Sequence, residues 1–212
     1  MKALVIGATG AVGKDLVGQL LADGQFERVD IFVRREVDIQ SDKLIVHVVD
    51  FDSPASWADQ LAGDVLFSFM GTTIKAAGTQ DAQWKVDYTY QLDTARAARS
   101  NGVPTYVLVS SIGANPQSKV FYTRMKGALE DAVRGLGFEG CFILRPPSLI
   151  RKGSDRFGEK AGVGILRAFN AIGILRNLAP MPTEAVAAAM IRLAKSGRKG
   201  TEIISSQDIL KA

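Results

Sequence analysis

The sequence predicts a three-layer α/β fold, in which helices cover both faces of one doubly wound parallel sheet. Short apolar runs rich in β-branched residues alternate with longer segments whose apolar residues recur at helical spacing. A glycine-rich loop joins the first such run to the first such segment. The length of 212 residues and the hydrophobic share of 47% fit one domain with a sizeable core. We therefore expect residues 1–212 to form a single domain.

The first half of the chain contains four expected strands. Residues 2–7 are apolar and stop at a glycine, which is typical of a buried strand. Residues 11–24 carry apolar side chains at helical spacing, and Gly24 is a suitable helix end. The other elements expected here are strands at 28–35, 43–50 and 64–71, and a short helix at 54–63 that begins with a proline.

The second half continues the alternation until residue 147. Residues 147–180 interrupt it, and we interpret them as a substrate-side subregion, or lid, of the same domain. Asn101 and Gly102 are suitable residues to end a long helix. The expected elements are a helix at 83–102, a strand at 104–114, a helix at 121–130, a strand at 140–149, a helix after Pro182 and a short strand near 201–205.

Composition excludes several classes of protein. No run of 18 apolar residues is present, so no membrane span is expected. A net charge of +4 is too small to indicate a nucleic-acid partner. With Cys141 as the one cysteine and His47 as the one histidine, we expect no disulfide and no metal site, and we interpret both residues as structural. The first residues lack the long apolar region of a signal peptide, which predicts a cytoplasmic protein.

The positive charge is concentrated late in the chain. Residues 145–176 hold seven basic and two acidic residues, a local net charge of +5. This is either a solvated basic surface or a site for an anionic ligand, which would be a cofactor phosphate or the substrate. We expect a small-molecule substrate, with an anionic one as an option, and we also consider a homodimer.

The loop "GATGAVG" predicts a dinucleotide site. Gly7 permits the tight turn after a strand, Gly10 lets the backbone approach a pyrophosphate, and Gly13 lets the helix pack closely on the sheet. The N–H groups at the start of the helix would bind the phosphates. The expected contacts in this loop are Gly7, Thr9, Gly10, Ala11, Val12 and Gly13.

The residues after the second strand indicate which dinucleotide is bound. Arg34 and Arg35 stand where an acidic residue would bind the ribose 2′-hydroxyl of NAD, and Asp30 lies too early in the strand for that role. Because guanidinium groups pair well with phosphate, we expect NADP(H) to be preferred over NAD(H).

Two further strand ends are expected to face the cofactor. At the end of the third strand Asp50 either reaches the adenine or caps the following turn, and Phe51 lies beside it. After the fourth strand we expect Gly71, Thr72 and Thr73 to lie close to the ribose.

A set of polar side chains follows the fifth strand. Ser110 and Ser111 end this strand, and Tyr122 and Lys126 lie one helical turn apart shortly afterwards. A neighbouring ammonium favours the phenolate form of a tyrosine, so Tyr122 could exchange a proton with a carbonyl or alcohol oxygen. Lys126 would assist Tyr122 and hold the ribose, and a serine would orient the substrate.

The segments "GATGAVG", "VSSIGA", "FYTRMKGALE" and "LRPPSL" together resemble the short-chain dehydrogenase/reductase superfamily. More narrowly, the chain is similar to its atypical NAD(P)H-binding members of the Tat-interacting oxidoreductase group. The resemblance implies a Rossmann fold and a catalytic set of Ser111 (or Ser110), Tyr122 and Lys126. We also count Ser110, Tyr122, Lys126, Arg145 and Pro146 among the cofactor contacts. Asp87 stands where that superfamily often has an asparagine.

Three functions agree with these observations. The first is an NADPH-dependent oxidoreductase for a small carbonyl or alcohol. The second is an NADPH-binding regulatory or sensor protein without turnover. The third is a sugar-nucleotide epimerase or dehydratase, which the short C-terminal region disfavours.

Overall fold

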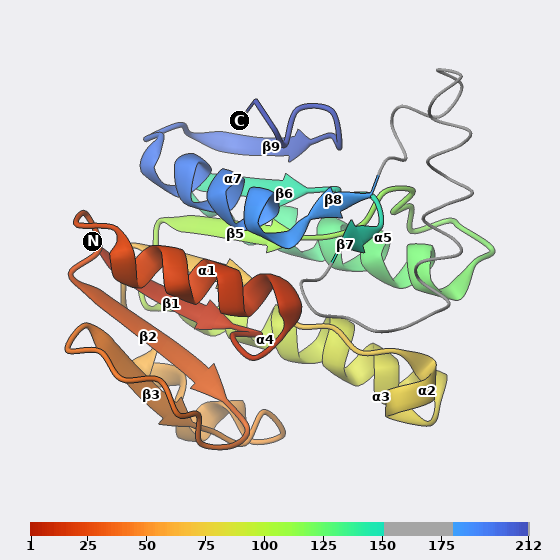
Figure 1. The fold of residues 1–212 in the computed structure, drawn as a ribbon. Coiled ribbons are helices and arrows are strands. Elements are labelled where there is room, and N and C mark those ends of the chain that lie inside the picture. Colours follow the sequence, from red (N-terminus) through yellow and green to blue (C-terminus); the bar gives the residue numbers. More distant parts are fainter. Residues whose placement is uncertain (151–179, 212) are drawn as a thin grey trace.

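A computed structural model describes residues 1–150 and 180–211. Its centre is a seven-stranded, fully parallel sheet with the strand order β3-β2-β1-β4-β5-β6-β9 (Figure 1). The predicted doubly wound α/β fold is confirmed. The strands are β1 (Lys2–Ile6), β2 (Arg28–Val33), β3 (Leu44–Val48), β4 (Val65–Ser68), β5 (Thr105–Val109), β6 (Gly140–Leu144) and β9 (Gly200–Ile204).

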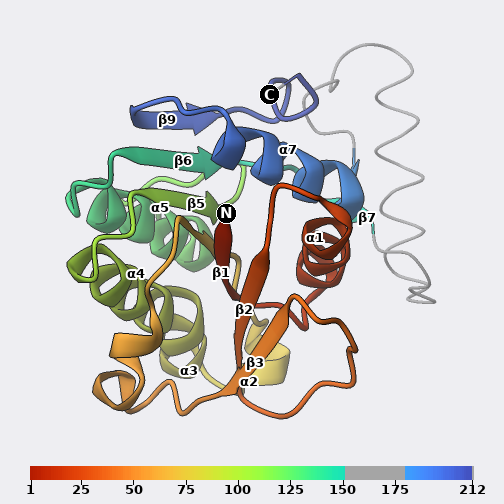
Figure 2. The same cartoon turned by 90° about the vertical axis from the view of Figure 1, so that its left-hand side faces the viewer.

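Helices cover both faces of this sheet, as the end-on view in Figure 2 shows. On one face lie α1 (Ala11–Ala22) and α7 (Thr183–Lys195), which contact each other. On the other face lie α4 (Tyr90–Ser100) and α5 (Phe121–Arg134). The two cores between these layers follow from the period of two along a strand.

Alternate strand residues therefore enter different cores. Val5 and Phe67 pack in the core below α1 and α7. Leu4 and Leu66 pack in the core below α4 and α5. All four side chains are fully buried, which explains why the central strands are continuous apolar runs in the sequence.

The strand order reverses between β1 and β4. From β1 the chain proceeds outward to β2 and β3, then returns to the other side of β1 for β4, β5 and β6. Ligands of such sheets bind at the carboxyl ends of the strands beside this reversal. The glycine loop after β1 and Gly71 after β4 both lie there.

One expected helix is wrong. Residues 54–63 form two short 3₁₀ turns, Pro54–Ser56 and Ala58–Gln60, rather than one helix. Trp57 separates them with φ −138°, outside the helical region, because its indole Nε1 donates a hydrogen bond to the Asp50 carbonyl at 2.9 Å. Tertiary bonding of one large side chain outweighs helix propensity in so short a segment.

The long helix expected at 83–102 has more parts than the sequence indicates. It begins at α3 (Gln80–Trp84), passes through a π-helical turn (Lys85–Thr89) and continues as α4. Thr79 caps its start by accepting a hydrogen bond from the Ala82 amide at 3.1 Å. A one-turn helix, α2 (Ile74–Ala77), precedes it.

The end of the described chain holds a small additional sheet. Strands β7 (Leu149–Ile150) and β8 (Met181–Pro182) pair in parallel just before α7. Of the lid expected at 147–180, residues 151–179 lie outside the described residues, as do most of the basic residues of 145–176. Within the described ranges, no helix combines the length and the apolar character needed to cross a membrane.

Candidate functional site

The glycine loop brings β1, α1 and the end of β4 into close contact. Gly7 has φ +92°, and a Cβ there would lie 2.9 Å from the backbone of Phe69 and Met70. A Cβ on Gly13 would lie 2.3 Å from the Gly7 carbonyl oxygen. Neither position can hold a larger residue without moving the backbone, so both glycines are required by packing.

The start of α1 is open to an anion. Gly10 is the N-cap residue, so no side chain caps the helix, and its first turn contains no acidic residue. The N–H groups and the positive end of the helix dipole therefore face the strand ends uncompensated. These are the features that let a helix terminus bind phosphate.

A hollow of about 150 Å³ lies in front of this loop. Its walls come from the glycine loop and from the carboxyl ends of β2 and β4, with Val86 from the π-helical turn. The lining residues are Gly7, Ala8, Thr9, Gly10, Phe32, Val33, Arg34, Phe51, Phe69, Met70, Gly71 and Val86. Six of these lie outside the contacts predicted from the sequence, namely Ala8, Phe32, Val33, Phe69, Met70 and Val86. All but Val86 adjoin strand ends or predicted contacts in the sequence.

Two exposed arginines follow β2, and the first of them, Arg34, lines the hollow. Within residues 1–150 and 180–211, neither Arg34 nor Arg35 has a hydrogen bond or a salt bridge. The positive charge of these two arginines is therefore available to an anion at the carboxyl end of β2.

Asp30 has a structural role away from the site. It is fully buried at the start of β2 and accepts hydrogen bonds from Arg28 and, at 3.1 Å, from His47. Burial raises the pKa of Asp30, but hydrogen bonds from Arg28, His47 and Lys2 outweigh it and hold the pKa below its ordinary value. His47 also stacks on Phe32 with ring centroids 4.6 Å apart, so it is the structural histidine that the sequence predicts.

The residues after β3 divide into two roles. Asp50 caps the following turn, because its carboxylate accepts hydrogen bonds from the Asp52 amide at 2.9 Å and the Ser53 hydroxyl at 3.2 Å. Phe51 lines the hollow and packs edge-on against Trp57, with ring centroids 5.3 Å apart. The sequence left open whether Asp50 reaches the adenine or caps this turn, and the structure shows the capping contacts.

After β4 the chain turns toward the π-helical segment. The Thr72 amide donates to Asp87 Oδ2 at 2.8 Å, and the Thr73 hydroxyl oxygen accepts from the Ala76 amide at 3.2 Å as the cap of α2. A Cβ on Gly71 would lie 3.4 Å from Asp87 Oδ1. The edge of the hollow is thus in direct contact with Asp87.

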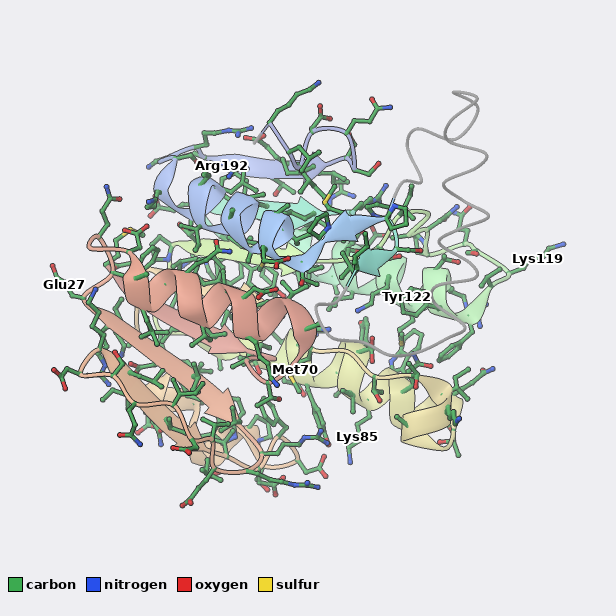
Figure 3. The ribbon with its side chains drawn as sticks, viewed as in Figure 1. Glu27, Met70, Lys85, Lys119, Tyr122 and Arg192 are labelled. Carbon is green, nitrogen blue, oxygen red and sulfur yellow. The ribbon has the colours of Figure 1, made fainter. Side chains whose placement is uncertain are left out.

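Tyr122 and Lys126 share one face of α5, as predicted. The Lys126 ammonium nitrogen lies 5.8 Å from the centroid of the Tyr122 ring. Lys126 is buried and contacts Asp87 Oδ1 at 3.1 Å, whereas Tyr122 is 39% exposed. Figure 3 labels Tyr122 and Met70, and both lie on the side toward which the strand arrowheads point. The position of α5 is fixed by Gly127, where a Cβ would lie 2.3 Å from the backbone of Asn115 and Pro116.

The two serines after β5 have different surroundings. Ser110 is buried and donates to Glu130 Oε1 at 2.5 Å, and Arg145 Nε donates to the same oxygen at 3.0 Å. The hydrogen bond to Glu130 raises the pKa of Arg145. Ser111 is half-buried and donates to the Ile112 carbonyl at 3.2 Å, so it lies outside this buried cluster. The Pro146 carbonyl accepts from the Ile112 amide at 3.0 Å.

Comparison with known proteins adds to this geometry. A family model described as NAD(P)H-binding matches residues 7–196. "Protein FMP52, mitochondrial" of Saccharomyces cerevisiae is 34% identical over 223 residues, covering 99% of this chain and 95% of that protein. Its counterpart in Candida glabrata is 39% identical over 165 residues, covering 76% of this chain and 68% of that protein. Because these relatives are named mitochondrial, the expected cytoplasmic location is wrong. The first residues were an insufficient guide, since they test only for a secretory signal.

Solved structures of the same fold share little sequence with this chain. "MoeE5 in complex with UDP-glucuronic acid and NAD" has a TM-score of 0.75 at 19% identity, covering 96% of this chain and 75% of that one. A short-chain dehydrogenase/reductase family oxidoreductase from Burkholderia thailandensis has a TM-score of 0.74 at 17% identity, covering 100% and 93%. They support the fold. The family match over residues 7–196 shows that this chain belongs to the NAD(P)H-binding family.

Proposed function

We propose that the protein is an NADPH-dependent oxidoreductase acting on a small carbonyl or alcohol. The observation that carries the proposal is a continuous set of contacts between the hollow and α5. Gly71 lines the hollow, the next amide, of Thr72, donates to Asp87, and Asp87 contacts Lys126. Lys126 in turn lies 5.8 Å from the Tyr122 ring centroid. A proton-exchanging pair is thereby coupled to the dinucleotide site.

The described residues suit an NADP molecule. The open start of α1 and the close approach at Gly7 and Gly13 would hold the pyrophosphate. Arg34 and Arg35, which lack carboxylate partners in the described ranges, would hold the 2′-phosphate. The bound cofactor would supply hydride. We therefore propose a preference for NADP(H) over NAD(H).

The chain's own residues would handle the proton. Tyr122 would donate to, or accept from, the substrate oxygen, and Lys126 would hold the ribose and influence the charge of Tyr122. Ser111 would orient the substrate oxygen, because Ser110 is already bonded to Glu130. Since Tyr122 is 39% exposed, water can restore its proton directly.

The test is NADPH oxidation over a panel of small aldehydes and ketones. We expect wild-type protein to oxidise NADPH with at least one of them, and Tyr122→Phe to lose about 10²-fold or more of that rate. Unchanged turnover in Tyr122→Phe would exclude Tyr122 as the proton donor. NADPH affinity of both proteins should match, which shows that the variant keeps its cofactor site.

A second candidate is an NADPH-binding regulatory protein without turnover. It is favoured by the Ser111 hydroxyl, which donates to the neighbouring Ile112 carbonyl rather than to Tyr122. Tight NADPH binding together with no oxidation over the carbonyl panel would support this candidate over the first.

A further inference from the structure

We infer that Asp87 is a positioning residue: by pairing with Lys126 it cancels the positive charge that would otherwise favour the phenolate form of Tyr122. The inference deepens the proposed function and rests on it, because it concerns how Tyr122 and Lys126 would act there. Its physical part, the effect of Asp87 on Tyr122, can be measured with no substrate.

The carboxylate of Asp87 is held at two points. Oδ1 lies 3.1 Å from the Lys126 ammonium, and Oδ2 accepts the Thr72 amide at 2.8 Å. The side chains of Lys126 and Asp87 are only 4% and 1% exposed. In such surroundings solvent screens charges poorly, so the partner of Lys126 has a large effect on the field around it.

Asp87 lies on the π-helical turn Lys85–Thr89, and a side chain of the following helix, α4, holds this turn in place. The side-chain nitrogen Nε2 of Gln91 donates to the Asp87 carbonyl at 2.6 Å and to the Met70 carbonyl at 3.0 Å. The side-chain oxygen of Gln91 accepts the Ser68 hydroxyl at 2.8 Å. Turns of this kind are rare and often occur at functional sites. Here the irregular turn ties the Asp87 backbone to the end of β4.

An isolated ammonium beside a phenol favours the phenolate form. When a carboxylate contacts that ammonium, the pair is electrically neutral and most of this effect is cancelled. Other charged groups of α5 have partners of their own: Glu130 pairs with Arg145, which follows β6, and Arg124 donates to the Ser118 and Lys119 carbonyls. Among the described residues, Asp87 is the carboxylate that pairs with Lys126.

The protonated form of Tyr122 is the one that carbonyl reduction would need. The Tyr122 hydroxyl would give its proton to the carbonyl oxygen as the C=O π bond breaks, with bound NADPH supplying hydride to the carbon and becoming NADP⁺. Water would then reprotonate the phenolate. Oxidation of an alcohol would start from the phenolate, so we expect its rate to rise toward higher pH than that of reduction.

The test is a pH titration of protein labelled with ¹³C at Cζ of its four tyrosines. Loss of one resonance in Tyr122→Phe assigns Tyr122. We expect Asp87→Asn to ionise Tyr122 at a pH lower than wild type by about one unit or more. The double variant Asp87→Asn/Lys126→Met, in which the pair is again neutral, should return to the wild-type midpoint. Asp93→Asn, which changes a half-buried carboxylate paired with Arg96 on α4, is the matched control and should shift nothing.

Equal midpoints in wild type and Asp87→Asn, with cooperative unfolding and NADPH affinity retained, would overturn the inference. If Asp87→Asn does not fold, Lys126→Met is compared with the double variant. The double variant should then ionise Tyr122 at the lower pH, and equal values would again overturn it. None of these results depends on turnover, whereas failure of the proposed function would be seen as NADPH binding without NADPH oxidation.

Discussion

The ammonium of Lys126 lies 3.1 Å from Asp87 Oδ1, and neither side chain has significant contact with solvent. This ion pair joins α5, which follows β5, to the π-helical turn that follows β4. It therefore connects the residues proposed for proton transfer with the edge of the dinucleotide hollow.

Asp87→Ala should destabilise the protein by about 3–5 kcal/mol, because it leaves the Lys126 charge buried without a partner. Urea unfolding measures the change. The double variant Asp87→Ala/Lys126→Met should recover a large part of the loss. Asp131→Ala is the control: it breaks an exposed pair with Arg134 and should cost less than about 1 kcal/mol. If Asp87→Ala destabilised the protein as little as Asp131→Ala does, the Asp87–Lys126 pair would not be buried as described.

Arg34→Ala and Arg35→Ala should weaken NADPH binding and leave NADH binding nearly unchanged. A hydrogen bond to a charged group is worth about 1.5–3 kcal/mol, so the stronger of the two effects should be about tenfold or more in Kd. Calorimetric titration of both dinucleotides provides the values. Arg96→Ala, on the exposed side of α4, is the matched control. Equal wild-type affinity for NADH and NADPH would remove the basis for a 2′-phosphate site.

Gly13 and Gly18 both lie on α1, but their replacement by alanine should have opposite effects on the stability of the protein. At Gly13 a Cβ would lie 2.3 Å from the Gly7 carbonyl oxygen, so overpacking should cost about 1–3 kcal/mol and disrupt NADPH binding. At Gly18 no atom lies within 4 Å, so alanine should stabilise α1 by about 0.5–1 kcal/mol and keep binding. Thermal unfolding with and without NADPH distinguishes them. A neutral Gly13→Ala would contradict the close packing of α1.

Asp30 should make the protein acid-sensitive. Its pKa is lowered in the folded state, so the unfolded chain binds more protons between the two pKa values and stability rises with pH there. The contribution is complete above the unfolded pKa of about 3.9 and is lost as pH falls through the folded value. Urea unfolding at several pH values below 5 should show that the free energy of unfolding falls less steeply with decreasing pH in Asp30→Asn than in wild type. Parallel curves would show that other carboxylates control acid unfolding.

Much of the fold could be predicted because its signals are local. Each central strand is a short apolar run with both faces buried, and such runs contrast clearly with the helical segments between them. The helix at 54–63 could not be judged correctly, because its outcome depends on where the Trp57 indole finds an acceptor. That acceptor, the Asp50 carbonyl, is defined only by the folded turn.

The site was predictable in part for the same reason. Gly7, Gly10 and Gly13 follow one another in a recognisable loop, and Tyr122 and Lys126 are one turn apart. Asp87 was visible in the sequence only as a replacement for an asparagine. Its contact with Lys126 joins two separate helices through an irregular turn, which residue spacing does not reveal.

Transfer of deuterium from the cofactor to a carbonyl carbon would demonstrate oxidoreductase activity. Wild-type protein is incubated with NADPH deuterated at the transferable C4 position and with each carbonyl compound of the panel, and the alcohols are examined by mass spectrometry. We expect one deuterium at the carbinol carbon with wild type and a far smaller amount with Tyr122→Phe. Tight NADPH binding with no deuterated alcohol from any compound would contradict an oxidoreductase.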